Sequence, residues 1–223
     1  MLIFILGAGY GAWHTLLAIF AFGVAITMAL VVHEWAHAWA ANKSGDPTAK
    51  MMGRMSLNPR RHVEPVGLVS FMLVGIGWAK PVPVNPFNYR NFKWGNFFVS
   101  ISGIVVNLIL AIVFSLCLYF MDTYAHVSLH GNIGIWALYQ FFMMATFLNV
   151  ALMIFNLLPI FPLDGYNILR SFTKPNNSYM QFVRNNTHWL LITVILVIMV
   201  TGWFGMLRDS IIGAFLWFWG LIF

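Results

Sequence analysis

Long apolar runs alternate with short polar segments along this chain. A helix needs about 20 apolar residues to cross a membrane, and several runs approach or exceed that length. The pattern therefore predicts an all-α polytopic membrane protein with about five transmembrane helices, and a polar loop over residues 165–187. The five predicted spans are Trp13–Trp39, Gly95–Phe120, Gly134–Leu158, His188–Phe204 and Asp209–Phe223.

The segment between the first two spans holds two irregular features. The apolar run Val66–Gly77 is too short to cross a bilayer, which favours a re-entrant or interfacial segment. The following GWAKPVPVNP has three prolines, which forbid a helix and favour a short extended, β-like stretch. We expect residues 1–223 to form one domain, with a catalytic core over about 13–172 and accessory helices over about 187–223.

Composition agrees with a membrane protein and narrows the possible chemistry. The chain is 61% hydrophobic and 8% charged, whereas soluble domains carry roughly 25% charged residues. No basic stripe with interleaved exposed aromatic residues is present, so a nucleic-acid partner is not expected. The single cysteine, Cys117, excludes a disulfide within the chain and a metal site of several thiolates. Any metal must therefore be bound by His, Asp or Glu.

The basic residues predict the orientation in the membrane. Eleven of the twelve Lys and Arg residues lie between spans one and two or between spans three and four, and residues 121–133 contain none. Basic loops stay in the cytoplasm, so the N-terminus is predicted to lie outside. Arg208 is the exception, and Asp209 follows it directly.

The sequence HEWAH in the first span carries the candidate chemistry. His33 and His37 are four residues apart, so on a helix both imidazoles point to one side and can bind one metal ion. Glu34 lies beside them and is positioned to take a proton from water activated by zinc. The alternative is a pair of core histidines with a buried glutamate, which is costly inside a membrane.

A catalytic zinc site needs a third protein ligand. His126 and His130 are also four apart, but they lie in the predicted outer loop and are expected to be solvated. Asp164 is the next-to-last residue of the stretch NLLPIFPLDG, which lies at the predicted cytoplasmic end of a span, on the same side as HEWAH. Pro159 and Pro162 break the helix there, so the backbone can turn Asp164 toward the metal. The alternative is a surface aspartate in a helix-ending turn.

HEWAH together with NLLPIFPLDG resembles the site-2 protease family of intramembrane zinc metalloproteases. SLNPRRHVEPVG and GWAKPVPVNP are similar to its compact prokaryotic branch without PDZ or CBS domains. The resemblance implies one zinc ion held by His33, His37 and Asp164, with Glu34 activating water.

The resemblance also implies roles for two asparagines. Asn156 would contact the substrate or the oxyanion, as a donor aimed at developing negative charge. Asn107 matches a second polar position that faces the site; its alternative is a hydrogen bond between helices near Gly103. Ile104 and Tyr166 depart from residues common in the family, which puts local substrate contacts in doubt.

The extended stretch suggests how a substrate could bind. A helix must unwind before a protease can reach its peptide bonds, and a strand edge could bind the unwound segment through its backbone. Val82, Val84 and Asn85 are the candidate substrate-binding residues. The alternative is a proline-rich loop at the membrane surface.

The expected function is hydrolysis of a peptide bond within or next to a transmembrane segment of another membrane protein, as in regulated intramembrane proteolysis. The expected setting is the lipid bilayer of a prokaryotic cell membrane, with the active site near the cytoplasmic face. The alternatives are a divalent-metal transporter and a non-catalytic scaffold; transporters usually show internal repeats, and none is evident. The sequence does not indicate an oligomeric state.

Overall fold

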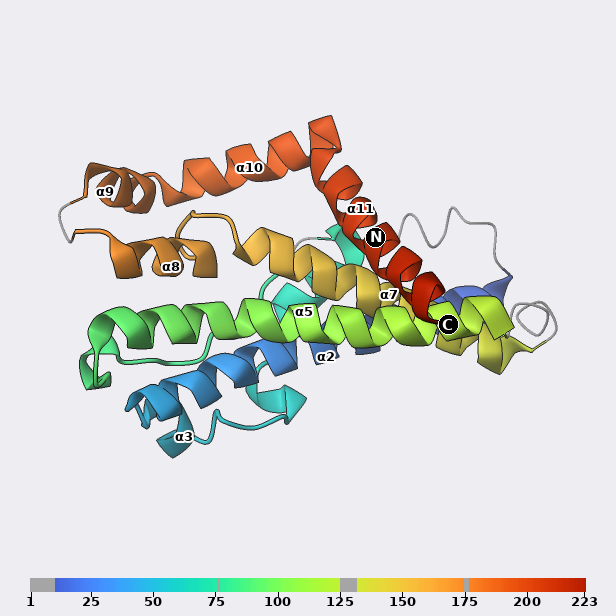
Figure 1. Cartoon of the computed structure of the whole chain (residues 1–223), viewed down its shortest axis with the longest axis horizontal. Coiled ribbons are helices and arrows are strands. Elements are labelled where there is room, and N and C mark those ends of the chain that lie inside the picture. The colour runs from blue at the N-terminus through green and yellow to red at the C-terminus, as the bar shows by residue number, and fades with distance from the viewer. Residues whose placement is uncertain (1–10, 76, 125–131, 175–176) are drawn as a thin grey trace.

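Three long helices form the centre of the molecule. The computed structural model describes residues 11–75, 77–124, 132–174 and 177–223. Helices α2 (Ala12–Ser44), α5 (Phe92–Tyr124) and α7 (Ile133–Asn156) lie side by side along the long axis and pack against one another (Figure 1). They correspond to the first three predicted spans. The described residues contain no strand, so the all-α membrane class is confirmed.

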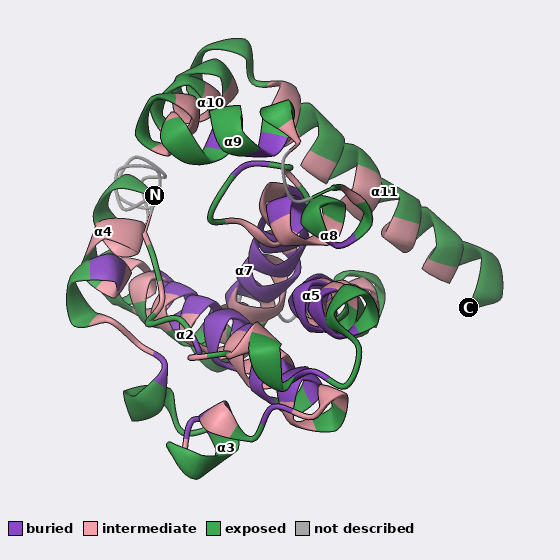
Figure 2. Ribbon diagram, turned by 90° about the vertical axis from the view of Figure 1, so that its left-hand side faces the viewer, coloured by how far each residue is buried: buried purple, intermediate pink, exposed green. Residues whose placement is uncertain are grey.

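Small residues let these helices approach closely. The buried side of α2 is rich in alanine, and α5 and α7 pack onto it. Close packing of small residues is a common way to join helices in lipid, where burial of apolar area provides little driving force. Buried residues gather on α2, α5 and α7, whereas α10 and α11 are mostly exposed (Figure 2). The buried alanines of α2 are Ala18, Ala21, Ala25, Ala29, Ala36, Ala38, Ala40 and Ala41.

The segment between α2 and α5 is mostly irregular. Its helices are short: α3 (Thr48–Met51), η1 (Pro59–Arg61), α4 (Pro65–Val74) and η2 (Pro86–Asn88). Helix α4, with ten residues, is too short to cross a bilayer, as predicted. Residues 77–85 form neither helix nor strand. Gly67 and Gly77 let α4 pack closely against residues 77 and 78, since a Cβ at Gly67 would lie 2.1 Å from the carbonyl oxygen of Trp78.

The prediction that residues 165–187 form a loop was wrong. They form most of α8 (Asp164–Phe172) and all of α9 (Ser178–Asn185). The segment is polar on average, but its apolar residues recur at helical spacing. They pack the two helices against neighbouring elements. In α9, for example, Met180 and Val183 are buried in a cluster with Ile160 and Tyr166.

The C-terminal region contains α10 (Thr187–Thr201) and α11 (Trp203–Ile222), which meet at Gly202. Helix α11 packs on α5 and α7 and ends near the far end of α5, where Phe120 and Phe223 are 5.1 Å apart between ring centroids (Figure 1). Among the described residues, four helices are long and apolar enough to cross a membrane; α9 and α10, bent by 80°, make a fifth if counted as one span. His126 and His130 lie outside the described residues.

Candidate metal centre

Three side chains from two distant parts of the chain converge at the cytoplasmic end predicted for α2. His33 and His37 lie one turn apart on α2, and their Nε2 atoms are 3.0 Å apart. Asp164, the first residue of α8, places Oδ2 3.4 Å from Nε2 of His33 and 3.3 Å from Nε2 of His37. The three side chains are between 7% and 13% exposed. Among the described residues they form the one group whose ligand atoms could hold a metal ion.

The donor atoms fit a tetrahedral zinc site. Zinc–ligand bonds of about 2.0–2.1 Å in a tetrahedron place neighbouring ligand atoms about 3.3 Å apart, close to the three observed separations. Oδ2 of Asp164 is buried and has no hydrogen-bond donor among the described residues other than the imidazoles. Two nitrogen donors and a carboxylate oxygen around one point are a ligand set that zinc accepts.

Helix α5 fixes the protonation of His37. Nδ1 of His37 is 2.7 Å from the carbonyl oxygen of Val99. A carbonyl only accepts hydrogen bonds, so Nδ1 carries the proton and Nε2 keeps its lone pair for a metal. The hydroxyl of Ser102 also donates to the Val99 carbonyl, at 2.7 Å. These contacts hold the imidazole in one orientation.

Gly103 makes room for both imidazoles. A Cβ at this position would lie 2.5 Å from Cε1 of His33 and 2.7 Å from Nε2 of His37. Such distances are far inside van der Waals contact, so a larger residue would displace the histidines or α5. Gly103 therefore shapes the site directly.

A tight turn brings Asp164 to the histidines. Helix α7 ends at Asn156, and the chain turns before α8 begins at Asp164. A Cβ at Gly165 would lie 2.2 Å from the carbonyl oxygen of Leu157 and 2.5 Å from that of Leu158. The Asp-Gly pair thus combines a candidate ligand with the one residue type that lets the start of α8 pack against the end of α7.

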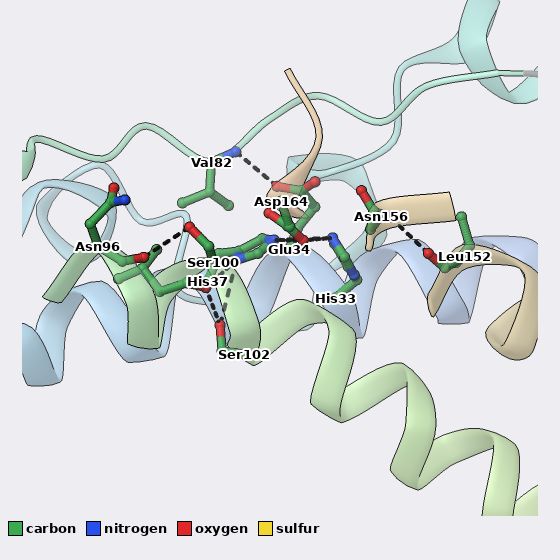
Figure 3. A network of polar contacts seen from close by, with 11 residues as sticks. His33, Glu34, His37, Val82, Asn96, Ser100, Ser102, Leu152, Asn156 and Asp164 are labelled. Atoms are coloured by element: carbon green, nitrogen blue, oxygen red, sulfur yellow. Dashed lines mark hydrogen bonds and ion pairs between the residues drawn. The ribbon is translucent and has the colours of Figure 1, made fainter. Parts of the chain in front are cut away.

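Glu34 is held by the irregular segment before α5. The backbone N–H of Val82 donates to Oε2 of Glu34 at 2.8 Å, beside the two histidines (Figure 3). One carboxylate oxygen thus has a fixed donor and the other remains for proton transfer. The N–H of Val82 contacts Glu34 in this structure, so it is not available to a substrate at the same time.

Two buried residues hold the beginning of this segment. The guanidinium of Arg54 donates to the carbonyl oxygens of Lys80 and Pro81, at 2.7 and 3.2 Å. The carbonyl of His62 accepts from the N–H of Lys80, at 2.8 Å. Burial, together with the nearby Arg54, lowers the pKa of His62, which favours the neutral imidazole. These contacts anchor the backbone just before Val82.

Asp46 holds the other end of the segment. Its carboxylate accepts from the N–H of Asn85 at 2.6 Å, from the side chain of Asn88 at 2.8 Å, and from Thr48. Burial by itself would raise the pKa of Asp46, but these hydrogen bonds outweigh burial and lower the pKa below its ordinary value. Asp46 therefore stays ionised at neutral pH and ties residue 85 to the end of α2.

The site opens into a cavity of about 510 Å³. His33, Glu34 and Asn156 line it, together with apolar residues of α4, α7 and α10. The side-chain amide of Asn156 donates to the carbonyl of Leu152 at 3.0 Å, and Figure 3 shows Asn156 beside the metal-binding group. The wall includes residues beyond 172, so helices expected to be accessory also line the cavity.

The remaining candidates differ in their surroundings. Asn107, one turn beyond Gly103 on α5, is fully buried, and neither amide atom has a hydrogen-bond partner among the described residues. Its side chain nevertheless interacts with His33 of α2, so the role at the site and the contact between helices both stay predictions. Val84 is exposed, while the N–H of Asn85 is bonded to Asp46.

A family model described as "Peptidase family M50" matches residues 21–200. The chain belongs to peptidase family M50. This is the site-2 protease family that HEWAH and NLLPIFPLDG resemble, so the expected family is confirmed. Membership supports a zinc-dependent peptidase that crosses the membrane several times. No solved structure matches the M50 chain significantly.

Named relatives agree with this family. The M50 chain is 40% identical, over 68% of each chain, to a Bacillus subtilis protein named "Putative zinc metalloprotease YwhC". It is 28% identical to "Putative zinc metalloprotease Rip2" of Mycolicibacterium smegmatis, over 76% of this chain and 64% of the relative. It is 25% identical to "Zinc metalloprotease MJ0392" of Methanocaldococcus jannaschii, over 71% of this chain and 36% of the relative. The match thus spans under two thirds of the latter two relatives.

The sequence pattern did not reveal several residues around the site of this M50 peptidase. Arg54, Asp46 and His62 act through the backbone of residues 80–85, and Val99 acts through its carbonyl. None of these contacts has a local sequence signal. Gly165 did have a local sequence signal, because glycine after a helix-breaking turn often marks a close approach of two backbone segments.

Proposed function

We propose that this M50 protein is an intramembrane zinc endopeptidase, with His33, His37 and Asp164 as the zinc ligands. The observation that carries the proposal is the approach of their three ligand atoms to within 3.0–3.4 Å, beside Glu34 and at the wall of a largely apolar cavity. The substrate is a transmembrane segment of another membrane protein, cleaved within or next to the bilayer. The setting is a prokaryotic cell membrane, with the site near the cytoplasmic face.

The residues divide the reaction between them. Zinc, when bound, acts as a Lewis acid that makes water nucleophilic near neutral pH. Glu34 takes the proton of the attacking water on Oε1, while the N–H of Val82 holds Oε2. As the water oxygen bonds to the carbonyl carbon and the C–N bond breaks, Glu34 returns the proton to the departing amine nitrogen.

Asn156 and Asn107 are the proposed polar contacts for the reacting peptide. Asn156 lines the cavity together with Glu34, where its amide can contact the carbonyl oxygen that gains negative charge. Asn107 is buried on the helix that contacts both imidazoles, and its side chain interacts with His33. The irregular stretch offers Val84 for backbone contact with the unwound substrate, next to Val82 and Asn85.

The deciding experiment compares the wild type with Glu34→Gln on a transmembrane substrate in proteoliposomes, with zinc content measured in both. Glutamine keeps the size of the side chain but cannot take the proton, so we expect cleavage to fall at least about 100-fold while zinc stays. Equal cleavage by the two forms contradicts the role of Glu34. Metal flux into the vesicles without cleavage supports a transporter, and bound substrate without cleavage by the wild type supports a scaffold.

A further inference from the structure

Arg208 is a charged residue in an apolar setting that the proposed reaction leaves without a role. It lies on α11, and it is the only Lys or Arg among the described residues that line the cavity of the metal centre. The other basic residues occur between spans one and two or between spans three and four. An ionisable residue at membrane level is costly and usually serves a function.

The guanidinium is held at the cavity wall. Its Cζ lies 3.9 Å from the ring centroid of Phe147, another cavity-lining residue on α7. Asp209 accepts from Nε and Nη2, at 2.7 and 3.0 Å. The Arg208 side chain is 18% exposed and that of Asp209 64% exposed. Arg208 therefore stacks on α7 while its carboxylate partner remains largely outside the packed structure.

Spare donors remain on this guanidinium. Arginine has five N–H groups, and two of them bond to Asp209. Among the described residues the other three have no acceptor that would occupy them. The cavity has few other polar side chains: His33, Glu34, Trp78 and Asn156. A substrate oxygen that enters the cavity away from the metal centre would meet Arg208 as the main donor.

A substrate of this peptidase brings such oxygens with it. Unwinding a helix leaves backbone carbonyls without partners, and an unsatisfied polar group is costly in an apolar environment. We propose that Arg208 binds an acceptor oxygen of the substrate's transmembrane segment, which makes it a substrate-binding residue distant from the reacting bond. The oxygen comes from an unwound backbone carbonyl or from an acidic or amide side chain. The inference rests on the proposed function.

The position of Arg208 predicts where the contact falls. Phe147 precedes Asn156 by nine residues on α7, which corresponds to about 13 Å along the helix. An extended peptide covers about 3.3 Å per residue. The contacted group therefore lies roughly four residues from the cleaved bond when that part of the substrate is extended.

The test measures cleavage by zinc-loaded full-length protein in proteoliposomes. The variants are Arg208→Met, which keeps an apolar stem, and Arg208→Lys, which keeps the charge but lacks the fork of donors. The substrates are an all-apolar transmembrane peptide and versions with one Asp at successive positions from the cleavage site. A charged hydrogen bond is worth about ten- to 100-fold, so we expect Arg208→Met to raise KM by that factor with kcat changed less. Arg208→Lys should lie between.

The substrates separate the two sources of the oxygen. If a backbone carbonyl binds, Arg208→Met raises KM for the all-apolar peptide as well. If a side chain binds, Arg208→Met raises KM only for peptides with Asp about four residues from the cleaved bond. Arg184→Met, the same exchange on α9, is the control and should leave KM unchanged. An unchanged KM for all peptides with both Arg208 variants overturns the inference, as does a loss of kcat at constant KM with lowered thermal stability.

A binding measurement keeps this inference separate from the proposed function. The affinity of a fluorescent all-apolar peptide and of its Asp version is measured for Glu34→Gln with and without Arg208→Met. Weaker binding of either peptide by the double variant supports the contact even if the wild type cleaves nothing. Equal affinities for both peptides contradict it even if the wild type is an active protease.

Discussion

At the scale of single residues, the site depends on its glycines as much as on its ionisable side chains. Gly103 and Gly165 occupy places where a Cβ would collide with an imidazole or with backbone carbonyls. His33, His37 and Asp164 can approach to 3.0–3.4 Å only because these two positions carry no side chain. The glycines of this M50 peptidase therefore control the geometry of the three candidate ligands.

Gly103→Ala tests this dependence. The added methyl group forces His33 and His37 apart, and a misplacement of about 1 Å can lower activity about 100-fold. We expect zinc content and cleavage to fall together, measured by metal analysis and by proteoliposome assay. Gly213→Ala is the control, because a Cβ there meets no atom within 4 Å. Full zinc content and wild-type cleavage in Gly103→Ala would show that α5 can shift to accommodate the methyl group without loss of zinc binding or activity.

At the scale of elements, the irregular segment before α5 connects three anchoring side chains to the candidate metal centre. Asp46, Arg54 and His62 anchor residues 80–85, and Val82 in turn holds Glu34. The predicted β-like stretch forms no strand, and two of the three candidate residues use their N–H groups within the protein. Val84 is the candidate that keeps its N–H without an acceptor among the described residues.

Val84→Pro tests whether this stretch binds substrate through its backbone. Proline removes the N–H, and one hydrogen bond is worth about two- to tenfold, so KM should rise by that factor. Val84→Ala keeps the N–H and controls for the smaller side chain. Cleavage is measured for both with one transmembrane substrate. If the two variants behave alike, the stretch is a surface loop with no pairing role.

At the scale of the whole molecule, the arrangement separates a packed centre from a looser wall. Helices α2, α5 and α7 bury most of the core, while α10 and α11 have no buried residues and still line the cavity (Figure 2). An apolar cavity between a packed centre and exposed helices suits an apolar substrate segment. The orientation of this body in the membrane follows from the distribution of basic residues and stays a prediction.

Cysteine labelling tests the orientation. In a Cys117→Ser background, Tyr124→Cys at the end of α5 should react with an impermeant maleimide in intact bacterial cells. Lys50→Cys, on α3, should react only after permeabilisation, because basic segments stay in the cytoplasm. Both residues are exposed in the structure, so a lack of reaction reports on the membrane side. The reverse pattern would place the metal centre near the outer face.

The sequence by itself determined the membrane class, the positions of the first three spans, and the pair of histidines with Glu34. These are local properties: the length of an apolar run sets what it can span, and helical period places residues four apart on one face. Asp164 was predicted as a partner because proline and glycine mark a turn at the same membrane side. Its atomic distances to the histidines could not be predicted.

Only the tertiary structure decided how the separate parts meet. The helices at 165–187, the contact of Val82 with Glu34, the room made by Gly103 and the place of Arg208 at the cavity wall all involve residues far apart in the chain. Such contacts depend on how close helices pack and on which backbone groups lack partners within their own element. Local periodicity carries no information on either. The candidate ligands could therefore be predicted from the sequence, whereas the residues that position them could not.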